Sequence, residues 1–167
     1  KVKFVKADLF ETDFSEATVV TMYLLPALNI KLRPKILGLK PGTRIVSHSF
    51  DMREWKPDRT ATLRGNTAFL WIVPAKVAGV WELPNGEITF TQNFQMIEGA
   101  LRAGDRTAPI SGGRLRGDRI SFSARGAAYS GRVDGGRIEG SVKAGGKTTG
   151  WSATLRAGNP VSSPPSR

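Results

Sequence analysis

The chain has 167 residues, a formal net charge of +11 at neutral pH and no cysteine. Without cysteine it cannot form a disulfide framework, a thiolate zinc site or a cysteine nucleophile, and it suits a reducing cytoplasm as well as export. Its 25 basic residues include no two consecutive Lys or Arg, so a solvated basic surface is favoured over a nucleic-acid-binding role. No stretch approaches the roughly 20 apolar residues that span a bilayer.

The first forty residues have the pattern of strand, strand and helix. Residues 2–7 alternate apolar and basic side chains, which predicts a strand. Residues 17–25 are β-branched and almost uncharged, which predicts a strand covered on both faces of a parallel sheet. A helix is expected over residues 26–37, where apolar side chains recur every three or four positions. Pro26 suits its first turn, whereas Pro34 is expected to kink or divide it.

Three further segments lead to residue 73. Residues 43–50 follow a Pro-Gly turn and predict a short strand. Residues 51–66 are polar and predict a connecting loop, and residues 67–73 predict another strand. Strands that alternate with a helix at these spacings favour an α/β sheet.

From residue 77 onward the pattern favours an antiparallel β domain. A hairpin is expected from residues 79–83 and 87–98 around a Pro-Asn-Gly turn, with one apolar face on its second strand. That face is formed by Ile88, Phe90, Phe94 and Met96. Residues 144–148 (A-G-G-K-T) lack the first glycine of a phosphate-binding loop, and a hairpin turn is expected there.

A short repeat indicates how many strands this domain has. The pattern G-G-R-[L/I]-x-G begins at Gly112 and again at Gly135, 23 residues later, which is the length of about one hairpin. The spacing predicts an up-and-down antiparallel meander of roughly seven or eight strands, closed by residues 151–155. Residues 158–167 are rich in Pro and Ser, and a disordered tail is expected there.

Three ordered motifs in the first part of the chain resemble a known family. They are F-V-x-x-D-L-F-x-x-D at residues 4–13, A-T-V-V-T-M-Y-L-L-P-x-x-N at 17–29 and L-K-P-G-T-R-I-V-S-H-x-F-D-M at 39–52. They resemble the second half of bacterial class I methyltransferases that use S-adenosylmethionine. These proteins are in turn similar to the mitochondrial lysine methyltransferases of ATP synthase subunit c and the adenine nucleotide translocase. Some bacterial members also carry a trailing β domain that begins near L-W-I-V-P-A-x-V-A-G, here residues 70–79.

The resemblance implies S-adenosylmethionine as cofactor and assigns roles to five residues. Asp8 would accept a hydrogen bond from the adenine amino group at the end of a strand, and Leu9 would line the adenine pocket. Tyr23 and Pro26 would border the methyl group and the nucleophile, with the Tyr23 ring beside the cationic sulfonium. Asn29 would approach the substrate from the start of the helix. The implied reaction is N-methylation of a protein lysine or a similar amine.

Each assignment has a structural alternative, and two further residues have a lower rank. His48, the single histidine, and Asp51 are further candidates close to the substrate. Asp8 is otherwise a loop acid or a helix cap, and Tyr23 a core residue. Asp51 is otherwise a turn cap.

Part of the family's cofactor site is missing from the sequence. No G-x-G-x-x-G loop occurs, and the family's acidic residue after its second strand has no counterpart. In the family's sheet the first two strands separate the third from the fourth, so residues 2–7 and 17–25 would lack their neighbours. The chain also begins without Met. We therefore expect a fragment that lacks the N-terminal half of the methyltransferase domain and that alone binds the cofactor poorly and is inactive.

The expected fold class is α+β, with three regions. An incomplete Rossmann-like α/β methyltransferase segment is expected over residues 1–73, an antiparallel β-meander or barrel-like domain over 74–157, and a disordered tail over 158–167. The alternative function is a non-catalytic binding module for an acidic protein or a small ligand, with the α/β segment as a remnant. Its basic face would be made by arginines that otherwise only keep the domain soluble. They are Arg102, Arg106, Arg114, Arg116, Arg119, Arg125, Arg132 and Arg137.

Overall fold

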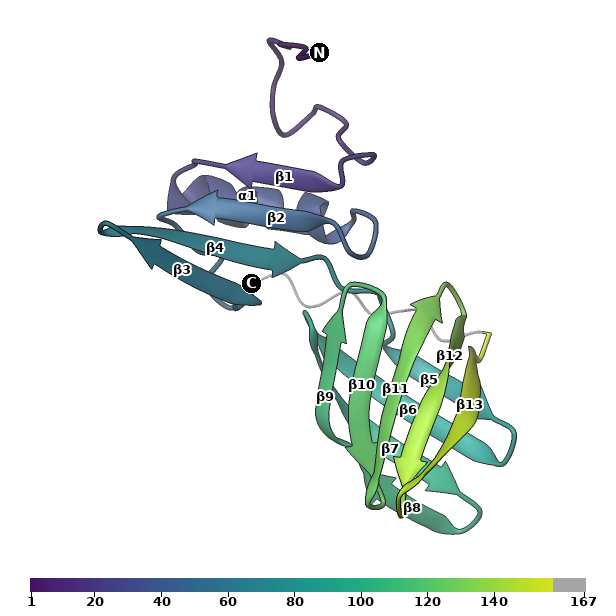
Figure 1. Ribbon diagram of the computed structural model, residues 1–167. Coiled ribbons are helices and arrows are strands. Elements are labelled where there is room, and N and C mark those ends of the chain that lie inside the picture. Colours follow the sequence, from purple (N-terminus) through teal and green to yellow (C-terminus); the bar gives the residue numbers. More distant parts are fainter. Residues whose placement is uncertain (158–167) are drawn as a thin grey trace. The chain divides into compact units, whose positions relative to one another are not determined.

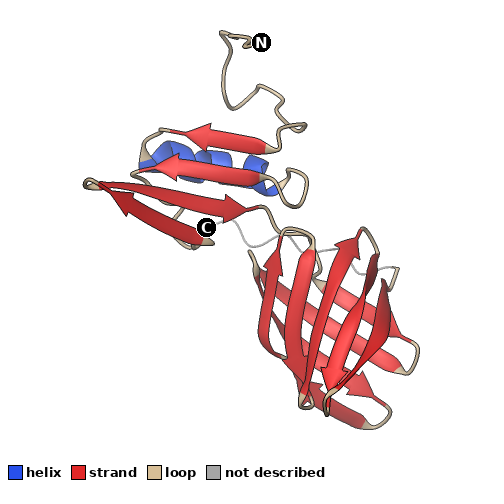
Figure 2. Ribbon diagram, in the orientation of Figure 1, coloured by secondary structure: helices blue, strands red, loops and turns tan. Residues whose placement is uncertain are grey.

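The computed structural model describes residues 1–157, so the predicted tail 158–167 lies outside the described residues (Figure 1). The chain divides into two compact units, with the boundary between Val73 and Pro74. Strands dominate both units, and α1 is the single helix among the elements in the described part of the chain (Figure 2). No helix in that part is long and apolar enough to cross a membrane.

The first unit is a four-stranded sheet with one helix. Its strands lie in the order β1-β2-β4-β3. β1 and β2 are parallel and are connected through α1, whereas β4 is antiparallel to both β2 and β3. The unit is therefore one parallel crossover followed by an antiparallel hairpin. The elements are β1 (Val19–Met22), α1 (Pro26–Leu37), β2 (Arg44–His48), β3 (Arg59–Leu63) and β4 (Asn66–Ile72).

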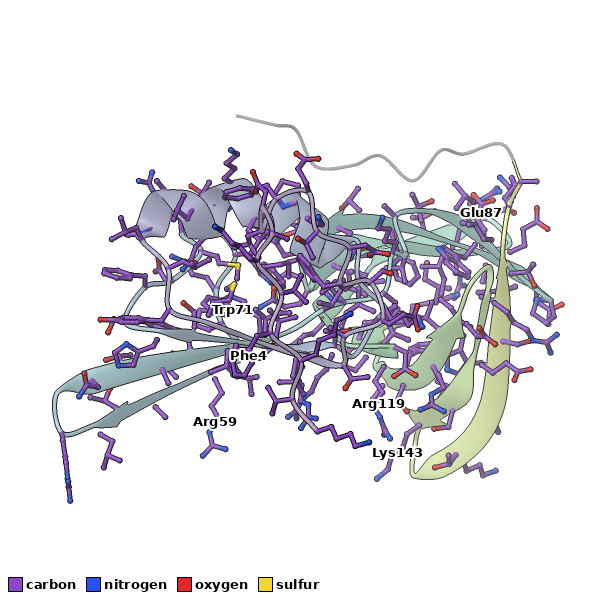
Figure 3. The ribbon with its side chains drawn as sticks, turned by 90° about the horizontal axis from the view of Figure 1, so that it is seen from above. Phe4, Arg59, Trp71, Glu87, Arg119 and Lys143 are labelled. Carbon is purple, nitrogen blue, oxygen red and sulfur yellow. The ribbon has the colours of Figure 1, made fainter. Side chains whose placement is uncertain are left out.

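One face of this sheet packs against α1. Ile45 and Trp71 are paired on adjacent strands and fully buried, as are Leu32 and Ile36 of the helix. The Trp71 indole Nε1 donates a hydrogen bond to the Trp55 carbonyl oxygen at 2.7 Å. This apolar layer fixes the crossover, because each element alone would leave its buried face in water. Figure 3 shows Arg59 projecting from the sheet on the side away from the helix.

The first two predicted strands differ from the structure. Residues 2–7 form no strand, and their side chains are exposed, with Phe4 at 93%. β1 is shorter than predicted and lies at the sheet edge, so the expectation of burial on both faces is wrong, and Val19 is 43% exposed. A strand forms only where its backbone groups find partners, and no described strand pairs with the outer side of β1.

The helix and the loop after it also differ in detail. Pro26 begins α1 as predicted, but Pro34 lies inside the helix without dividing it, because buried residues on either side hold both turns against the sheet. The predicted loop 51–66 contains β3, which the sequence did not indicate. All five side chains of β3 are exposed, so no apolar alternation marks the strand, and pairing with β4 alone defines it.

The second unit is a closed antiparallel barrel of eight strands. Pairing runs β5-β6-β7-β9-β10-β11-β12-β13 and returns to β5, with the short β8 attached to β7. This confirms the predicted meander and its closure by residues 151–155. The strands are β5 (Gly79–Leu83), β6 (Gly86–Asn93), β7 (Met96–Ala103), β8 (Arg106–Pro109), β9 (Ser111–Arg116), β10 (Arg119–Ala124), β11 (Ala127–Asp134), β12 (Arg137–Ala144) and β13 (Lys147–Leu155).

Alternate residues of the strands fill the barrel. Trp81, Leu115 and Ile138 are fully buried. The predicted single strand 87–98 is wrong, because Phe94 begins a turn with φ of +53° that separates β6 from β7. Beyond this turn Met96 faces solvent and its odd-numbered neighbours enter the core. The turn predicted near residues 144–148 is confirmed between β12 and β13.

Candidate functional site

The carboxyl ends of β1 and β2 meet at one edge of the first unit. Tyr23 follows β1, Pro26 begins α1 shortly afterwards, and His48 ends β2. Open α/β sheets bind ligands at the carboxyl ends of their parallel strands, where the chain turns into a helix or loop. This edge is therefore the candidate site, and it lies entirely within the first unit.

Two aromatic rings lie next to each other at this edge. The Tyr23 and His48 rings are 4.8 Å apart between centroids and nearly perpendicular. Tyr23 is 75% exposed, so it is not a core residue, and most of its ring is open to a ligand. The His48 Nδ1 lies 3.0 Å from the Ser49 Oγ, and Ser49 has a φ of +65°. His48, which ranked low from sequence, therefore lies beside the highest-ranked aromatic.

Asn29 ties α1 to the loop that follows β2. Its side chain is fully buried, and its amide nitrogen lies 3.2 Å from the Ser47 Oγ, 3.2 Å from the Phe50 carbonyl oxygen and 3.4 Å from that of Asp51. An amide group has two protons to donate, so three acceptors compete for them. The Oδ1 atom has no hydrogen-bond partner among the described residues. Asn29 thus positions the loop that carries Asp51, and its oxygen is an unused acceptor.

A second side chain of α1 holds the same loop. Arg33 Nη1 donates to the Met52 carbonyl oxygen at 3.0 Å and to the Glu54 carboxylate at 2.7 Å. The hydrogen bond from Arg33 lowers the pKa of the Glu54 carboxyl. Met52 and Trp55 are fully buried beside these contacts. The loop after β2 is therefore fixed at two points along α1.

The structure does not bring the predicted cofactor residues to this edge. The Asp8 Oδ1 accepts a hydrogen bond from the Phe10 backbone N–H at 2.8 Å, which makes a local turn. Phe10 in turn contacts the middle and the last turn of α1: Lys31 Nζ lies 4.1 Å from its ring centroid, and Lys35 Nζ donates to its carbonyl oxygen at 2.8 Å. Asp8 and the 39% exposed Leu9 therefore lie near the end of α1 and the start of β1. Tyr23 and Asn29 are at the other end of the helix, because Tyr23 lies between β1 and α1 and Asn29 is in the first turn of α1.

Sequence reasoning missed Ser47 and Arg33. Ser47 lies two residues after the buried Ile45 on the same strand, so the period of two would have placed it on the helix-facing side. Nothing in the sequence marks Arg33, because its partners are distant in the chain. Among the described residues, no three His, Asp or Glu side chains gather to hold a metal ion.

Residues 1–59 match the ANTKMT methyltransferase domain family. This part of the chain is therefore similar to methyltransferases. A protein-lysine N-methyltransferase from Saccharolobus islandicus (strain REY15A) is 46% identical over 78 residues, covering 44% of this chain and 48% of that protein. An RNA methyltransferase from Salinibacter ruber, solved in complex with S-adenosyl-L-homocysteine, is 56% identical over 44% of this chain and 49% of its own, with a TM-score of 0.43. The chain spans about half the length of these relatives, and the matched residues 1–59 contain the whole candidate site.

Proposed function

We propose that residues 1–73 are the acceptor-side part of a Rossmann-like methyltransferase domain that moves a methyl group from S-adenosylmethionine to a protein lysine. The observation that carries the proposal is the position of Tyr23, His48 and Asn29 at the carboxyl edge of the parallel strands, within the segment that matches the family. A protein acceptor is favoured by the name of the Saccharolobus relative.

The chemistry asks more of geometry than of reactive side chains. The amine lone pair attacks the methyl carbon, the carbon–sulfur bond breaks, and sulfur keeps the electron pair. Holding amine and sulfonium in line and excluding water supply most of the rate. Tyr23, followed closely by Pro26, offers an aromatic face to the cationic sulfonium. A desolvated pocket also favours the neutral, nucleophilic form of the amine.

Asn29 is the positioning residue in this proposal. Its amide holds the loop after β2 at Phe50 and Asp51, and its buried Oδ1 has no hydrogen-bond partner among the described residues. It thereby fixes one side of the acceptor site from inside the protein. Asp51 lies in the loop that Asn29 holds, and its carboxylate accepts a hydrogen bond from the Arg53 backbone N–H at 3.1 Å. That bond is consistent with a turn cap as well as with a site residue.

The adenine role of Asp8 and Leu9 depends on a conformational change. We propose that residues 2–7 become a strand when the other part of the sheet is present, which would carry Asp8 and Leu9 to the carboxyl edge. Two features support this: the alternation of residues 2–7 and the exposure of Val2 (80%) and Phe4 (93%). Exposed apolar side chains of this size favour burial against a partner.

A chimera tests the proposal. The 78 matched residues of the Saccharolobus enzyme are replaced by the corresponding part of this chain, and the transfer of tritiated methyl from S-adenosylmethionine to whole-cell protein is measured. We expect methyl-lysine after acid hydrolysis, and a loss of about tenfold or more in the Tyr23→Ala chimera. His48→Ala serves as the neighbouring comparison, with a smaller loss.

Three outcomes would contradict parts of this function. A folded chimera that binds S-adenosylmethionine but transfers no methyl group would refute the acceptor-side role. Label in RNA instead of protein would refute the lysine acceptor. Low-micromolar binding of S-adenosylmethionine to the isolated 167-residue chain, measured by calorimetry, would refute the incomplete cofactor site.

A further inference from the structure

The barrel of the second unit is hollow at one end. A cavity of about 630 Å³ lies at the end where the turns β5–β6 and β10–β11 close. Its volume is within the range of small-molecule sites. The lining is mainly apolar and comes from inward-facing strand residues: Leu83, Leu101, Tyr129, Val142 and Trp151. The rest of the lumen is filled by the core around Trp81, and the cavity is open to solvent.

Glycines on the barrel wall keep this space open. Gly131 and Gly140 are paired on β11 and β12, and a Cβ at Gly140 would come within 1.9 Å of the Ser130 carbonyl oxygen. The Trp151 ring lies against this wall, because a Cβ at Gly131 would be 3.3 Å from its Cζ2 atom. The Trp151 Nε1 donates to the Ser130 carbonyl oxygen at 2.9 Å. The indole is therefore held against the wall and leaves the lumen free.

Two aromatic rings form one side of the cavity. Tyr129 is stacked on the buried Phe122, with centroids 4.8 Å apart and planes 5° apart. Trp151 meets Tyr129 edge-on, with centroids 5.5 Å apart and planes at 88°. Both lining rings are half-buried, so each has a free surface. Such perpendicular rings suit a planar aromatic guest.

The charges at the cavity favour an anionic guest. Arg125 lines the cavity from the β10–β11 turn, and its guanidinium has no ion-pair partner in residues 1–157. Glu139, the one acidic lining residue, is already paired with Arg137. The cavity therefore presents one uncompensated positive charge next to its aromatic side, and a guanidinium binds a carboxylate through paired hydrogen bonds.

We propose that this cavity binds a small planar aromatic carboxylate, with its ring against Tyr129 and Trp151 and its carboxylate on Arg125. The site is independent of the methyl-transfer function, because it lies entirely in the second unit. It gives the barrel a ligand-binding role, and the exposed arginines on the outer surface need not take part.

The experiment titrates the full chain with 2-naphthoate by calorimetry and follows the four indole N–H signals by NMR. We expect saturable one-to-one binding with a shift of the Trp151 signal. Arg125→Asn is expected to weaken binding by about tenfold or more, because one charged hydrogen-bonding partner is lost. Asn tolerates the positive φ of Arg125 (+53°), and Arg64→Asn, at a φ of +50° in the first unit, is the matched control.

A neutral analogue separates the charge from the aromatic contact. 2-Naphthalenemethanol is expected to bind the wild type and Arg125→Asn equally, and more weakly than 2-naphthoate binds the wild type. Trp151→Leu is expected to weaken the binding of both ligands. If Trp151→Leu fails to fold, the Arg125→Asn comparison still decides. The proposal is overturned by the absence of saturable 2-naphthoate binding to the wild type, by unchanged binding in Arg125→Asn, or by an equal loss in Arg64→Asn.

Discussion

Substituting Asn29 by Asp is the most informative single change to the first unit. The change keeps the size of the side chain but replaces a donor by an acceptor in a fully buried position. The Ser47 hydroxyl can turn and donate to the new carboxylate, but the carbonyl oxygens of Phe50 and Asp51 cannot donate. The variant therefore leaves these acceptors unpaired and buries a negative charge beside them.

The expected loss of folding free energy in Asn29→Asp has two contributions. Each carbonyl left unsatisfied costs about 1–3 kcal/mol of folding free energy. Burial beside acceptors also raises the folded-state pKa of the introduced carboxyl above its unfolded value of about 3.9. The folded variant then keeps a proton that the unfolded chain has lost, so stability falls as pH rises through this interval. For a raise of about two units, the variant loses about 2.2 kcal/mol more at pH 7 than at pH 4, because the unfolded carboxyl is already partly ionised at pH 4.

Urea unfolding of the wild type and of Asn29→Asp at several pH values between 4 and 7 measures the difference in their unfolding free energies and how it changes with pH. Hydrogen exchange of the β1 and β2 amides assigns the loss to the first unit, and the barrel amides serve as an internal reference. Asn66→Asp is the matched control, because Asn66 is exposed in the β3–β4 hairpin of the same unit. A loss of unfolding free energy in Asn29→Asp that is independent of pH, or equal to the loss in Asn66→Asp, would refute this prediction.

Three further predictions concern the barrel and its stability in urea or acid. Trp81→Ala removes a fully buried indole whose Nε1 donates to the Val77 carbonyl oxygen at 2.7 Å, and we expect a loss of about 3–5 kcal/mol in urea unfolding. Gly99→Ala places a Cβ 1.8 Å from the Thr89 carbonyl oxygen at a φ of +149°, so we expect a collapsed near-ultraviolet circular dichroism signal, and a wild-type signal would contradict this close approach of β6 and β7. Hydrogen bonds from two arginines lower the pKa of Glu87, so its contribution to stability is present above its ordinary pKa and is lost as pH falls through the lowered value. Glu87→Gln should therefore be less stable than the wild type at pH 6 and should approach it at pH 3; an equal difference at both pH values would count against this.

The open edge of the first unit links its fold to the proposed function. β1 has a described partner on one side alone, and the apolar side chains of residues 2–5 lie in water. An unpaired strand edge and exposed apolar residues are costly in isolation. Both features agree with the proposal that further strands pair with β1, and the chimera tests this directly.

For the site, the sequence motifs named candidate residues but did not determine where these residues lie in the fold. The resemblance singled out Tyr23, Pro26 and Asn29, which lie at one edge of the unit. It also singled out Asp8 and Leu9, which lie near the other end of α1. A motif defines neighbours along the chain, whereas the distance between motifs depends on strands that pair with them in space.

The sequence alone determined those features that depend on nearby residues. Pro26 begins a helix because its fixed φ suits the first turn, and Gly145 and Gly146 form a turn because both adopt positive φ. The alternation of apolar residues and the spacing of the turns defined a closed antiparallel meander before its pairing was known. Each of these signals acts over a few residues and needs no distant partner.

Only the tertiary structure decided the features that depend on distant partners. Residues 2–7 alternate like a strand yet form none, whereas β3 has no alternation and is a strand, because pairing of backbone groups is what defines a strand. The buried Asn29–Ser47 contact and the cavity beside Trp151 likewise join residues that are far apart in the chain. Their positions follow from how the helix crosses the sheet and how the barrel closes, and no local pattern contains that information.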